Sequence, residues 1–144
     1  MTRSGKSHSR RPVSKRTPTW VKYVPEEVEA FVIKLAKEGQ TPSRIGVTLR
    51  DQYGIPLVKN VTGKSILTIL EEADLKPSTP EDLSNLLAKA SHLQRHLSKN
   101  RSDALNRRSL EIIISKIRRT GRYYKRIGRL PDDWKYRAET TYGL

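Results

Sequence analysis

The chain has 144 residues and 35% hydrophobic content, which allows one modest domain or two small helical units but leaves no room for a large catalytic cleft. Its formal net charge of +14, from 29 basic and 15 acidic residues, favours a polyanionic partner such as a nucleic acid or a membrane surface. The sequence contains no cysteine, which excludes disulfides and zinc knuckles, and no apolar run approaching the roughly 18 residues that a membrane-spanning helix needs.

The charge is distributed unevenly along the chain. Residues 1–24 carry seven basic residues and no acidic one, residues 25–92 carry eight basic and ten acidic, and residues 93–137 carry fourteen basic and four acidic. A solvated surface usually mixes the two signs, so this separation indicates two regions that bind a polyanion, with a near-neutral segment between them.

Residues 1–24 are expected to form a basic tail. They include Arg10 and Arg11 and hold almost nothing apolar before Trp20, so they bury too little surface to offset the entropy cost of ordering. We therefore expect the tail to be disordered until it meets phosphate groups. Nuclear and mitochondrial targeting sequences share this composition, but the apolar stretch of a secretory signal does not follow. Binding to nucleic acid is the favoured interpretation.

Two helices are predicted in the first part of the near-neutral segment. In the first, apolar residues recur at amphipathic spacing behind an acidic first turn: Val28, Phe31, Val32, Leu35 and Ala36, with Glu26, Glu27 and Glu29. Gly39 supplies a stop signal. Thr41 and Pro42 then indicate an N-cap and a proline at the first helical position, and the helix that they open ends near Tyr53 and Gly54.

The segment after Gly54 is predicted to be irregular and then helical. Residues 55–61 are too short for more than a loop or an extended stretch. A third helix is expected to follow Gly63 and to end before Lys76, with its apolar side chains turned inward: Ile66, Leu67, Ile69 and Leu70. Residues 25–76 are thus predicted to form a small unit of three helices.

Residues 77–144 are predicted to form a long antiparallel helical hairpin. Thr79 and Pro80 indicate a cap followed by a proline, and the helix continues to about Ser98 with an apolar stripe of Leu83, Leu86, Leu87, Ala90, Leu93 and Leu97. A polar break follows at residues 99–103. The second helix is expected from about Ala104 to Ile127, with an apolar side of Leu110, Ile113, Ile114, Ile117 and Tyr124. Because the link is short, the two apolar faces should meet.

No segment of useful length shows the alternating pattern of a strand, so the predicted fold is all-α. Its parts are the basic tail, the small helical unit and the helical hairpin.

Residues 26–51 resemble a helix-turn-helix, in which the second helix of a DNA-binding protein enters the major groove. That helix would offer Ser43, Arg44, Thr48 and Arg50, within a segment of net negative charge. Since DNA binding needs a cationic surface, a plain helical hairpin that packs on its neighbours is the favoured interpretation. A chromosomal or transcriptional DNA-binding protein is the alternative.

The second helix of the long hairpin carries the stronger candidate for a binding surface. Its polar side holds one acid, Glu111, among many basic residues: Arg107, Arg108, Lys116, Arg118, Arg119, Arg122, Lys125 and Arg126. A face so strongly biased to one sign is expected to meet phosphate. Tyr123 and Tyr124 lie among the arginines, where a tyrosine can stack on a ribose or an unstacked base. Of the two, Tyr124 is the better candidate for the core.

No metal site, cofactor or catalytic site is predicted. His92 and His96 share one helical face, but no third ligand lies at a familiar spacing, so His96 is expected to make a hydrogen bond near the polar break. The sequence has no glycine-rich phosphate loop, no nucleophile motif and no acid pair in apolar surroundings. An enzyme acting on RNA is therefore the least favoured alternative.

Several motifs resemble one protein family. The C-terminal third contains HLSKNRSDALNRRSLEIIISKIRRTGRYYKRIGRLPDDWKY, and earlier parts contain TPTWVKY, LAKEGQTPSRIGVTLRDQYGIPLVKNVTGKSIL and PEDL. These cover nearly the whole chain, and TPSxIGxxLRDxxG followed by VTGxxIL is specific. The chain resembles the universal small-subunit ribosomal protein fifteen family, in its archaeal and eukaryotic branch, which bears an N-terminal helical extension that bacteria lack.

The resemblance implies a structural protein of the small ribosomal subunit in the cytoplasm, with neighbouring ribosomal proteins as partners. It further implies binding to the central domain of small-subunit rRNA, early in assembly, at two regions. One is a three-way helical junction, for which Thr79 and Tyr123 occupy the family's contact positions. The other is a nearby purine-rich, wobble-containing stretch of one helix, read by the turn between the long helices, where His96, Asp103 and Asn106 occupy the matching positions.

The sequence departs from the bacterial pattern at both regions. At the turn, Asn106 stands where that pattern has serine, and Ala104 and Leu105 stand where it has histidines. At the junction, a family glutamine is replaced by Asp82 and an arginine by Lys89. The candidate RNA-binding residues are together Arg10, Arg11, Thr79, Lys89, His96, Arg101, Asp103, Asn106, Arg107, Arg108, Arg118, Arg119, Arg122, Tyr123 and Arg126.

Overall fold

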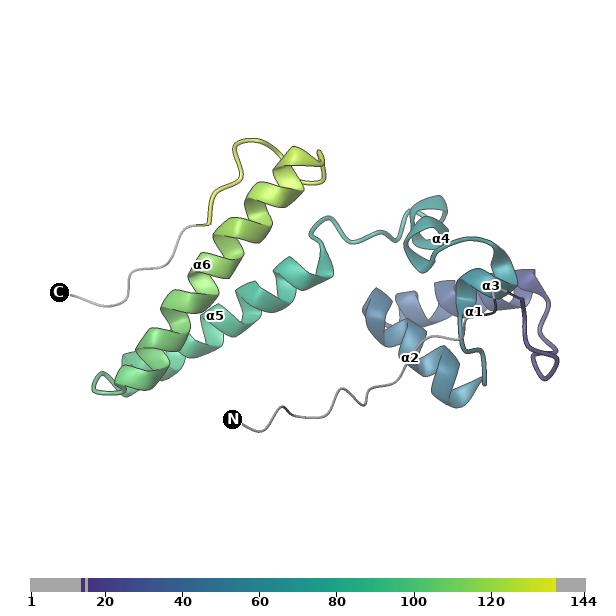
Figure 1. Cartoon of the computed structure of the whole chain (residues 1–144), viewed down its shortest axis with the longest axis horizontal. Coiled ribbons are helices and arrows are strands. Elements are labelled where there is room, and N and C mark those ends of the chain that lie inside the picture. The colour runs from purple at the N-terminus through teal and green to yellow at the C-terminus, as the bar shows by residue number, and fades with distance from the viewer. Residues whose placement is uncertain (1–13, 15, 137–144) are drawn as a thin grey trace. The chain divides into compact units, whose positions relative to one another are not determined.

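The computed structural model describes residue 14 and residues 16–136, and these contain helices and no strand. The elements in chain order are α1 (Pro25–Lys37), α2 (Pro42–Gln52), α3 (Val58–Thr62), α4 (Ile66–Glu72), α5 (Glu81–Lys99) and α6 (Ala104–Arg126) (Figure 1). The all-α prediction is confirmed. The chain divides into two compact units, one ending at Lys76 and the other beginning at Pro77. No helix among these residues is both long enough and apolar enough to cross a membrane.

The first unit is built around α1, which contacts α2, α3 and α4. Its start is defined by Glu27, whose carboxylate accepts a hydrogen bond from the backbone N–H of Val24 at 3.0 Å. At the start of α2, the Thr41 hydroxyl accepts a hydrogen bond from the N–H of Arg44, so the predicted cap is confirmed. The core of the unit takes residues from all four helices and one loop: Val28, Val32, Leu35, Ile45, Leu49, Ile55, Val58, Ile69 and Leu70.

The residues just before α1 belong to this unit. The Thr17 hydroxyl donates a hydrogen bond to the carbonyl of Asn60, and Val21 packs against the core. Tyr23 stacks edge-on against Phe31, with ring centroids 5.6 Å apart. The expectation that residues 1–24 form a disordered tail therefore does not extend to this stretch, while residues 1–13 and 15 lie outside the described part of the chain.

The prediction that residues 55–61 form only a loop or an extended stretch is wrong, because α3 begins at Val58. This helix has five residues, too few to show a hydrophobic period in the sequence. It ends where Gly63 adopts the left-handed conformation, with φ of 75°, and donates its N–H to the carbonyl of Lys59. Burial of Val58 against the core, a long-range effect, selects the helical conformation.

The second unit is an antiparallel hairpin of α5 and α6 (Figure 1), as predicted. The apolar seam between the two helices is continued by half-buried Leu86, Leu87, Leu93 and Ile114, and its buried members are Leu83, Ala90, Leu97, Leu110, Ile113 and Ile117. One expected detail is wrong. The N-cap of α5 is Pro80, with no side-chain hydrogen bond at the cap, so Thr79 does not cap this helix.

The chain after α6 turns back over the hairpin. Gly128, with φ of 72°, ends the helical path, and the N–H groups of Arg129 and Leu130 both donate to the carbonyl of Tyr124. Leu130 is buried in the hairpin core, and Trp134 and Tyr136 pack against it. We did not predict this return, which adds a third layer of side chains to the α5–α6 seam.

Candidate nucleic-acid interface

The cationic side of α6 is exposed along the length of the helix. Leu110, Ile113, Ile117 and Gly121 are buried, so the basic residues between them are turned toward solvent. The predicted basic residues of this helix are exposed, apart from a half-buried Lys125: Arg107, Arg108, Lys116, Arg118, Arg119, Arg122 and Arg126. Arg101, in the turn before α6, is exposed as well.

Some of these cations are engaged within the chain. Arg107 donates through Nη2 to the carbonyl of Arg101 at 2.6 Å. Arg108 pairs with Glu111 at 2.9 Å, but both side chains are exposed and water screens the pair. The side chains of five others make no hydrogen bond or ion pair with any described residue, and we call them the free cations of α6: Lys116, Arg118, Arg119, Arg122 and Arg126. Their charge is available to a polyanion.

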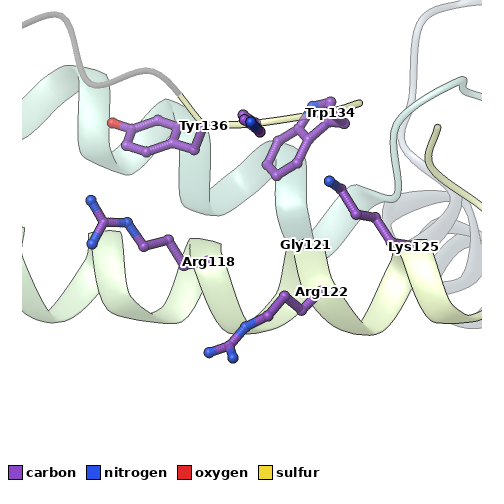
Figure 2. Close-up of a pocket in the computed structure, with 7 residues that line it drawn as sticks. Arg118, Gly121, Arg122, Lys125, Trp134 and Tyr136 are labelled. Atoms are coloured by element: carbon purple, nitrogen blue, oxygen red, sulfur yellow. The ribbon is translucent and has the colours of Figure 1, made fainter. Parts of the chain in front are cut away.

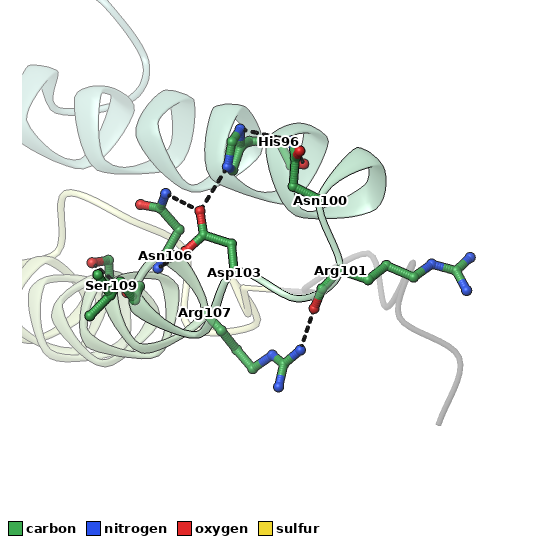
Figure 3. A network of polar contacts seen from close by, with 8 residues as sticks. His96, Asn100, Arg101, Asp103, Asn106, Arg107 and Ser109 are labelled. Carbon is green, nitrogen blue, oxygen red and sulfur yellow. Dashed lines mark hydrogen bonds and ion pairs between the residues drawn. The ribbon is translucent and has the colours of Figure 1, made fainter.

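The turn between α5 and α6 is organised around Asp103 (Figure 3). As the N-cap of α6, its Oδ1 accepts a hydrogen bond from the backbone N–H of Asn106 at 3.0 Å, and its Oδ2 accepts one from Asn106 Nδ2 at 2.8 Å. His96 Nε2 lies 3.1 Å from the same Oδ2. The structure therefore brings together the three turn residues that the resemblance singled out.

These hydrogen bonds set the electrostatics of the turn. The bonds from Asn106, first from its backbone and then from its side chain, together with the bond to His96, lower the pKa of Asp103 to about 2. Because a carboxylate only accepts, His96 Nε2 must carry the hydrogen that it shares with Asp103. His96 Nδ1 lies 3.3 Å from Asn100 Nδ2, which only donates, so Nδ1 is the acceptor. The turn thus presents a fixed imidazole and leaves the side-chain oxygen of Asn106 as an acceptor.

The opposite end of the hairpin is held by a hydrogen bond between its two helices. The Tyr124 hydroxyl donates to the carboxylate of Asp82, with both oxygens at 2.8 Å, and burial followed by this bond raises the pKa of Tyr124. The prediction that Tyr124 belongs to the core is confirmed in that the ring packs against the apolar seam. Tyr123, beside it, is 55% exposed. Thr79 is half-buried near the start of α5, and Lys89 is exposed further along it.

The two regions implied by the resemblance lie at opposite ends of a rigid hairpin. Fourteen residues of α5 separate Asp82 from His96, which is roughly 21 Å of helix. The free cations of α6 lie on the stretch that joins the two ends.

The alternative site, the helix-turn-helix of residues 26–51, lacks the surface that it would need. Thr48, one of the four side chains expected to face a groove, is buried, and its hydroxyl donates to Gln40 at 3.0 Å. Arg50 is paired with Asp51 at 2.7 Å. The structure favours a helical hairpin that packs on α3 and α4 over a recognition helix.

Two other predicted sites have different outcomes. His96 makes the hydrogen bond that we expected of it, and within the described residues no group of three His, Cys, Asp or Glu side chains is placed to hold a metal ion. Arg10 and Arg11, the predicted contacts of the tail, lie outside the described residues.

One feature of the hairpin was missed by the sequence analysis. A cavity of about 380 Å³ lies between α6 and the returning segment, and it is lined by Trp134, Tyr136 and several basic residues (Figure 2). The local signal for it is a short alternation of aromatic and basic residues from Trp134 to Arg137, preceded by two acids, and this is too short to show a helical or strand period.

Comparison with known proteins assigns the chain to a family. A family model described as ribosomal protein S15 matches residues 66–142, and a model described as the ribosomal S13/S15 N-terminal domain matches residues 1–55. The chain belongs to the ribosomal protein S15 family. The S15 model covers α4, the hairpin and the returning segment, and the N-terminal model covers the first two helices, so the family resemblance seen in the sequence is confirmed.

Individual members of the S15 family are similar over almost the full chain. The small ribosomal subunit protein uS15 of Nitrosopumilus maritimus is 54% identical over 136 residues, which is 94% of this chain and 91% of the relative. The uS15 protein of Hyperthermus butylicus is 50% identical over 134 residues, covering 93% of this chain and 83% of the relative. That of Sulfolobus acidocaldarius is also 50% identical, over 132 residues.

Proposed function

We propose that this chain is a structural constituent of the small ribosomal subunit, located in the cytoplasm, that binds the central domain of small-subunit rRNA. Its hairpin would bind a three-way junction at the Tyr123 end and an adjacent wobble-containing helix at the Asp103 end. The observation that carries the proposal is the hairpin itself, in which the free cations of α6 join two polar ends of different chemistry.

The physics of RNA defines how such a hairpin binds. The major groove of A-form RNA is too narrow for an α-helix, so the protein reads backbone shape and the shallow minor groove. The free cations of α6 neutralise phosphates, and each contact adds about one unit to the slope of log affinity against log salt. The turn is the selective end, because Asp103 and His96 fix the side chain of Asn106, whose oxygen presents a defined hydrogen-bond acceptor.

Rigidity gives the hairpin its role in subunit assembly. A junction of three RNA helices samples several arrangements, and a protein that binds two of the helices at a set spacing stabilises one arrangement. The apolar seam and the Tyr124–Asp82 hydrogen bond keep that spacing constant. Neighbouring ribosomal proteins are further partners, and the activity is structural, with no catalytic step.

Binding to a branched RNA tests the proposal. Gel-shift titrations would compare a three-way junction from the central domain with an unbranched duplex of the same length and composition. We expect much tighter binding to the junction, with an affinity that falls steeply as salt is raised. Equally tight binding to the unbranched duplex would contradict the proposal.

Substitutions separate selective contacts from general ones. Asp103→Ala or His96→Ala should weaken binding to RNA that contains the wobble helix and leave binding to the isolated junction nearly unchanged. Arg118→Ala should weaken both about evenly and reduce the salt slope by about one unit. Arg44→Ala, which removes an exposed cation from the near-neutral unit, is the matched control and should change neither.

A further inference from the structure

The returning segment after α6 is fixed by an aromatic contact on a glycine. Trp134 lies against Gly121 in the C-terminal part of α6, where a β-carbon would come within 2.5 Å of the six-membered ring of the indole. Any larger residue at position 121 would displace that ring. Tyr136 follows two residues later and packs against the hairpin core.

The cavity beside this contact combines aromatic rings with positive charge. Figure 2 shows the rings of Trp134 and Tyr136 above α6, with Arg118 beneath Tyr136 and Lys125 beside Trp134. Arg122 and Lys135 complete the basic part of the lining, and none of the residues that line the cavity is acidic. Its volume of about 380 Å³ is within the range of sites that bind small ligands, roughly 300–1,000 Å³.

This lining defines the chemistry of its ligand. The face of an aromatic ring or a guanidinium stacks on a flat π-system, and basic side chains at the rim attract a phosphate. A nucleotide carries both groups in one unit. An inorganic phosphate would leave the two rings without a partner, and an acidic peptide would offer charge without a flat surface to stack on.

The position of the cavity favours a nucleotide within an RNA strand. Arg118 and Arg122 line this cavity and also a second hollow next to it on α6, which includes Ser115 and Ile114. Both arginines are free cations of α6. Glu111, the one acid that lines the second hollow, is paired with Arg108, so a mainly cationic track leads along the helix to the cavity. A strand whose phosphates follow that track can turn a single base into the aromatic site.

We propose that the Trp134–Tyr136 cavity binds one unstacked nucleotide of the RNA, with its base stacked on the aromatic rings and its phosphate near Arg118 and Arg122. The site is separate from the turn at Asp103 and from Tyr123, and it rests on the proposed function because the partner is RNA. It gives the returning segment a role as an RNA-binding element.

Fluorescence of Trp134 tests the proposal directly. The chain has two tryptophans, so Trp20→Phe leaves Trp134 as the sole reporter. Titrating this variant with the central-domain junction RNA should strongly quench the emission as the RNA saturates the protein, because a stacked base quenches indole. Unchanged emission at saturation would overturn the proposal. Quenching by a mononucleotide but not by the RNA would also overturn it, in favour of a free nucleotide.

Affinity measurements on variants distinguish stacking from a purely structural role. Trp134→Leu keeps an apolar side chain over Gly121 but removes the ring, and we expect about a tenfold loss of affinity for the RNA, with an unchanged salt slope. Trp134→Phe should bind within about threefold of the parent protein, since it retains a ring. Val47→Ala, which shortens an exposed apolar side chain of the other unit, is the control and should bind like the parent.

Each contrary result has a distinct meaning. Full affinity of Trp134→Leu would show that the cavity holds no base. A loss of affinity that comes with a shallower salt slope would show that the substitution displaces phosphate contacts, and the stacking proposal would fall. If the parent protein itself does not bind the junction RNA, the proposed function fails first, and this inference fails with it.

Discussion

The unit that ends at Lys76 collects nine buried apolar residues from four helices and a loop, whereas the hairpin aligns its seven along one seam and the segment that returns over it. In the first unit, each helix contributes to a shared core and so buries a broad part of its surface. The exposed surface of this unit carries almost no net charge. A single seam leaves most of each helix exposed, and on α6 that exposed area is cationic. The proposed binding surface therefore lies on a helix of which only a narrow side is needed for packing.

The largest change in stability should come from creating a cavity in the core of one unit, and the other unit should keep its stability. Ile117→Ala in the hairpin and Ile45→Ala in the first unit each remove a fully buried side chain, and each should destabilise its own unit by about 3 kcal/mol. Hydrogen exchange resolved by peptide would report the two units separately. The exposed Ile112→Ala is the control and should change stability by less than about 0.5 kcal/mol. If one substitution reduced the protection from exchange in both units, the conclusion that the two cores stabilise their units independently would be wrong.

The helix caps provide a second contrast, because one unit uses a hydroxyl and the other a carboxylate. Thr41→Ala should destabilise the first unit by about 1 kcal/mol at any pH. Asp103 behaves differently, since its folded pKa of about 2 lies below the unfolded value near 3.9. Its contribution is therefore present above about pH 4 and is lost as the pH falls toward 2.

Acid unfolding of Asp103→Asn measures that contribution. Asparagine still caps a helix but does not titrate in this range, so the variant hairpin should lose less stability than the parent between pH 4 and pH 2. Thermal midpoints recorded across this range would give the difference. Identical pH profiles for the parent and the variant would contradict the network around Asp103.

The two units also differ in the surroundings of a glycine inside a helix. At Gly46 in α2, an added β-carbon would meet only Ile66 at 3.5 Å, an ordinary contact, so Gly46→Ala should stabilise the first unit by about 0.5–1 kcal/mol. Gly121→Ala has the same propensity gain but would displace Trp134. We expect it to give no gain in thermal stability and to expose the indole to a fluorescence quencher such as iodide. Equal stabilisation by both substitutions would contradict the contact.

The smallest predicted effect is a change in the ionisation of Tyr124, which is measured by absorbance. Burial and the bond to Asp82 raise the pKa of Tyr124, so its phenol adds stability below about pH 10, and this stability is lost as the pH rises through the folded value. In a titration of tyrosinate absorbance, Tyr124→Phe should remove the component that ionises last. Tyr123→Phe should leave that component in place. A late component that survives in Tyr124→Phe would show that another tyrosine is responsible.

The parts of the fold that could be predicted are those that depend on the spacing of apolar residues and cap motifs over a short stretch of sequence. The apolar periods of α1, α5 and α6, and the Thr41 cap before Pro42, are readable within a few residues of sequence. The spacing of apolar residues did not reveal α3, because this helix has only five residues and is too short for the helical period to repeat. The cap motif failed at Thr79, where it occurs one residue too early for the helix that follows.

The features of the candidate site also divide into those that depend on local sequence and those that depend on long-range contacts. The cationic side of α6 follows from residue order along one helix, whereas the cap that Asp103 forms at its start was not predicted. The Tyr124–Asp82 bond spans 42 positions, and the Trp134 contact depends on the absence of a side chain at Gly121. Such contacts are long-range and carry no period. A hydrogen bond from His96 was expected from its place near the polar break, but its partner Asp103 and the bond between Asp103 and Asn106 were not predicted.

The fit of Trp134 to Gly121 couples two positions that are thirteen residues apart in the chain. Neither residue can change size by itself without opening a gap or creating a clash, so the pair is expected to evolve together. Among related sequences, a larger residue at position 121 should coincide with a smaller one at position 134. The doubly substituted Gly121→Ala, Trp134→Leu chain should correspondingly tolerate the alanine better than the single substitution does.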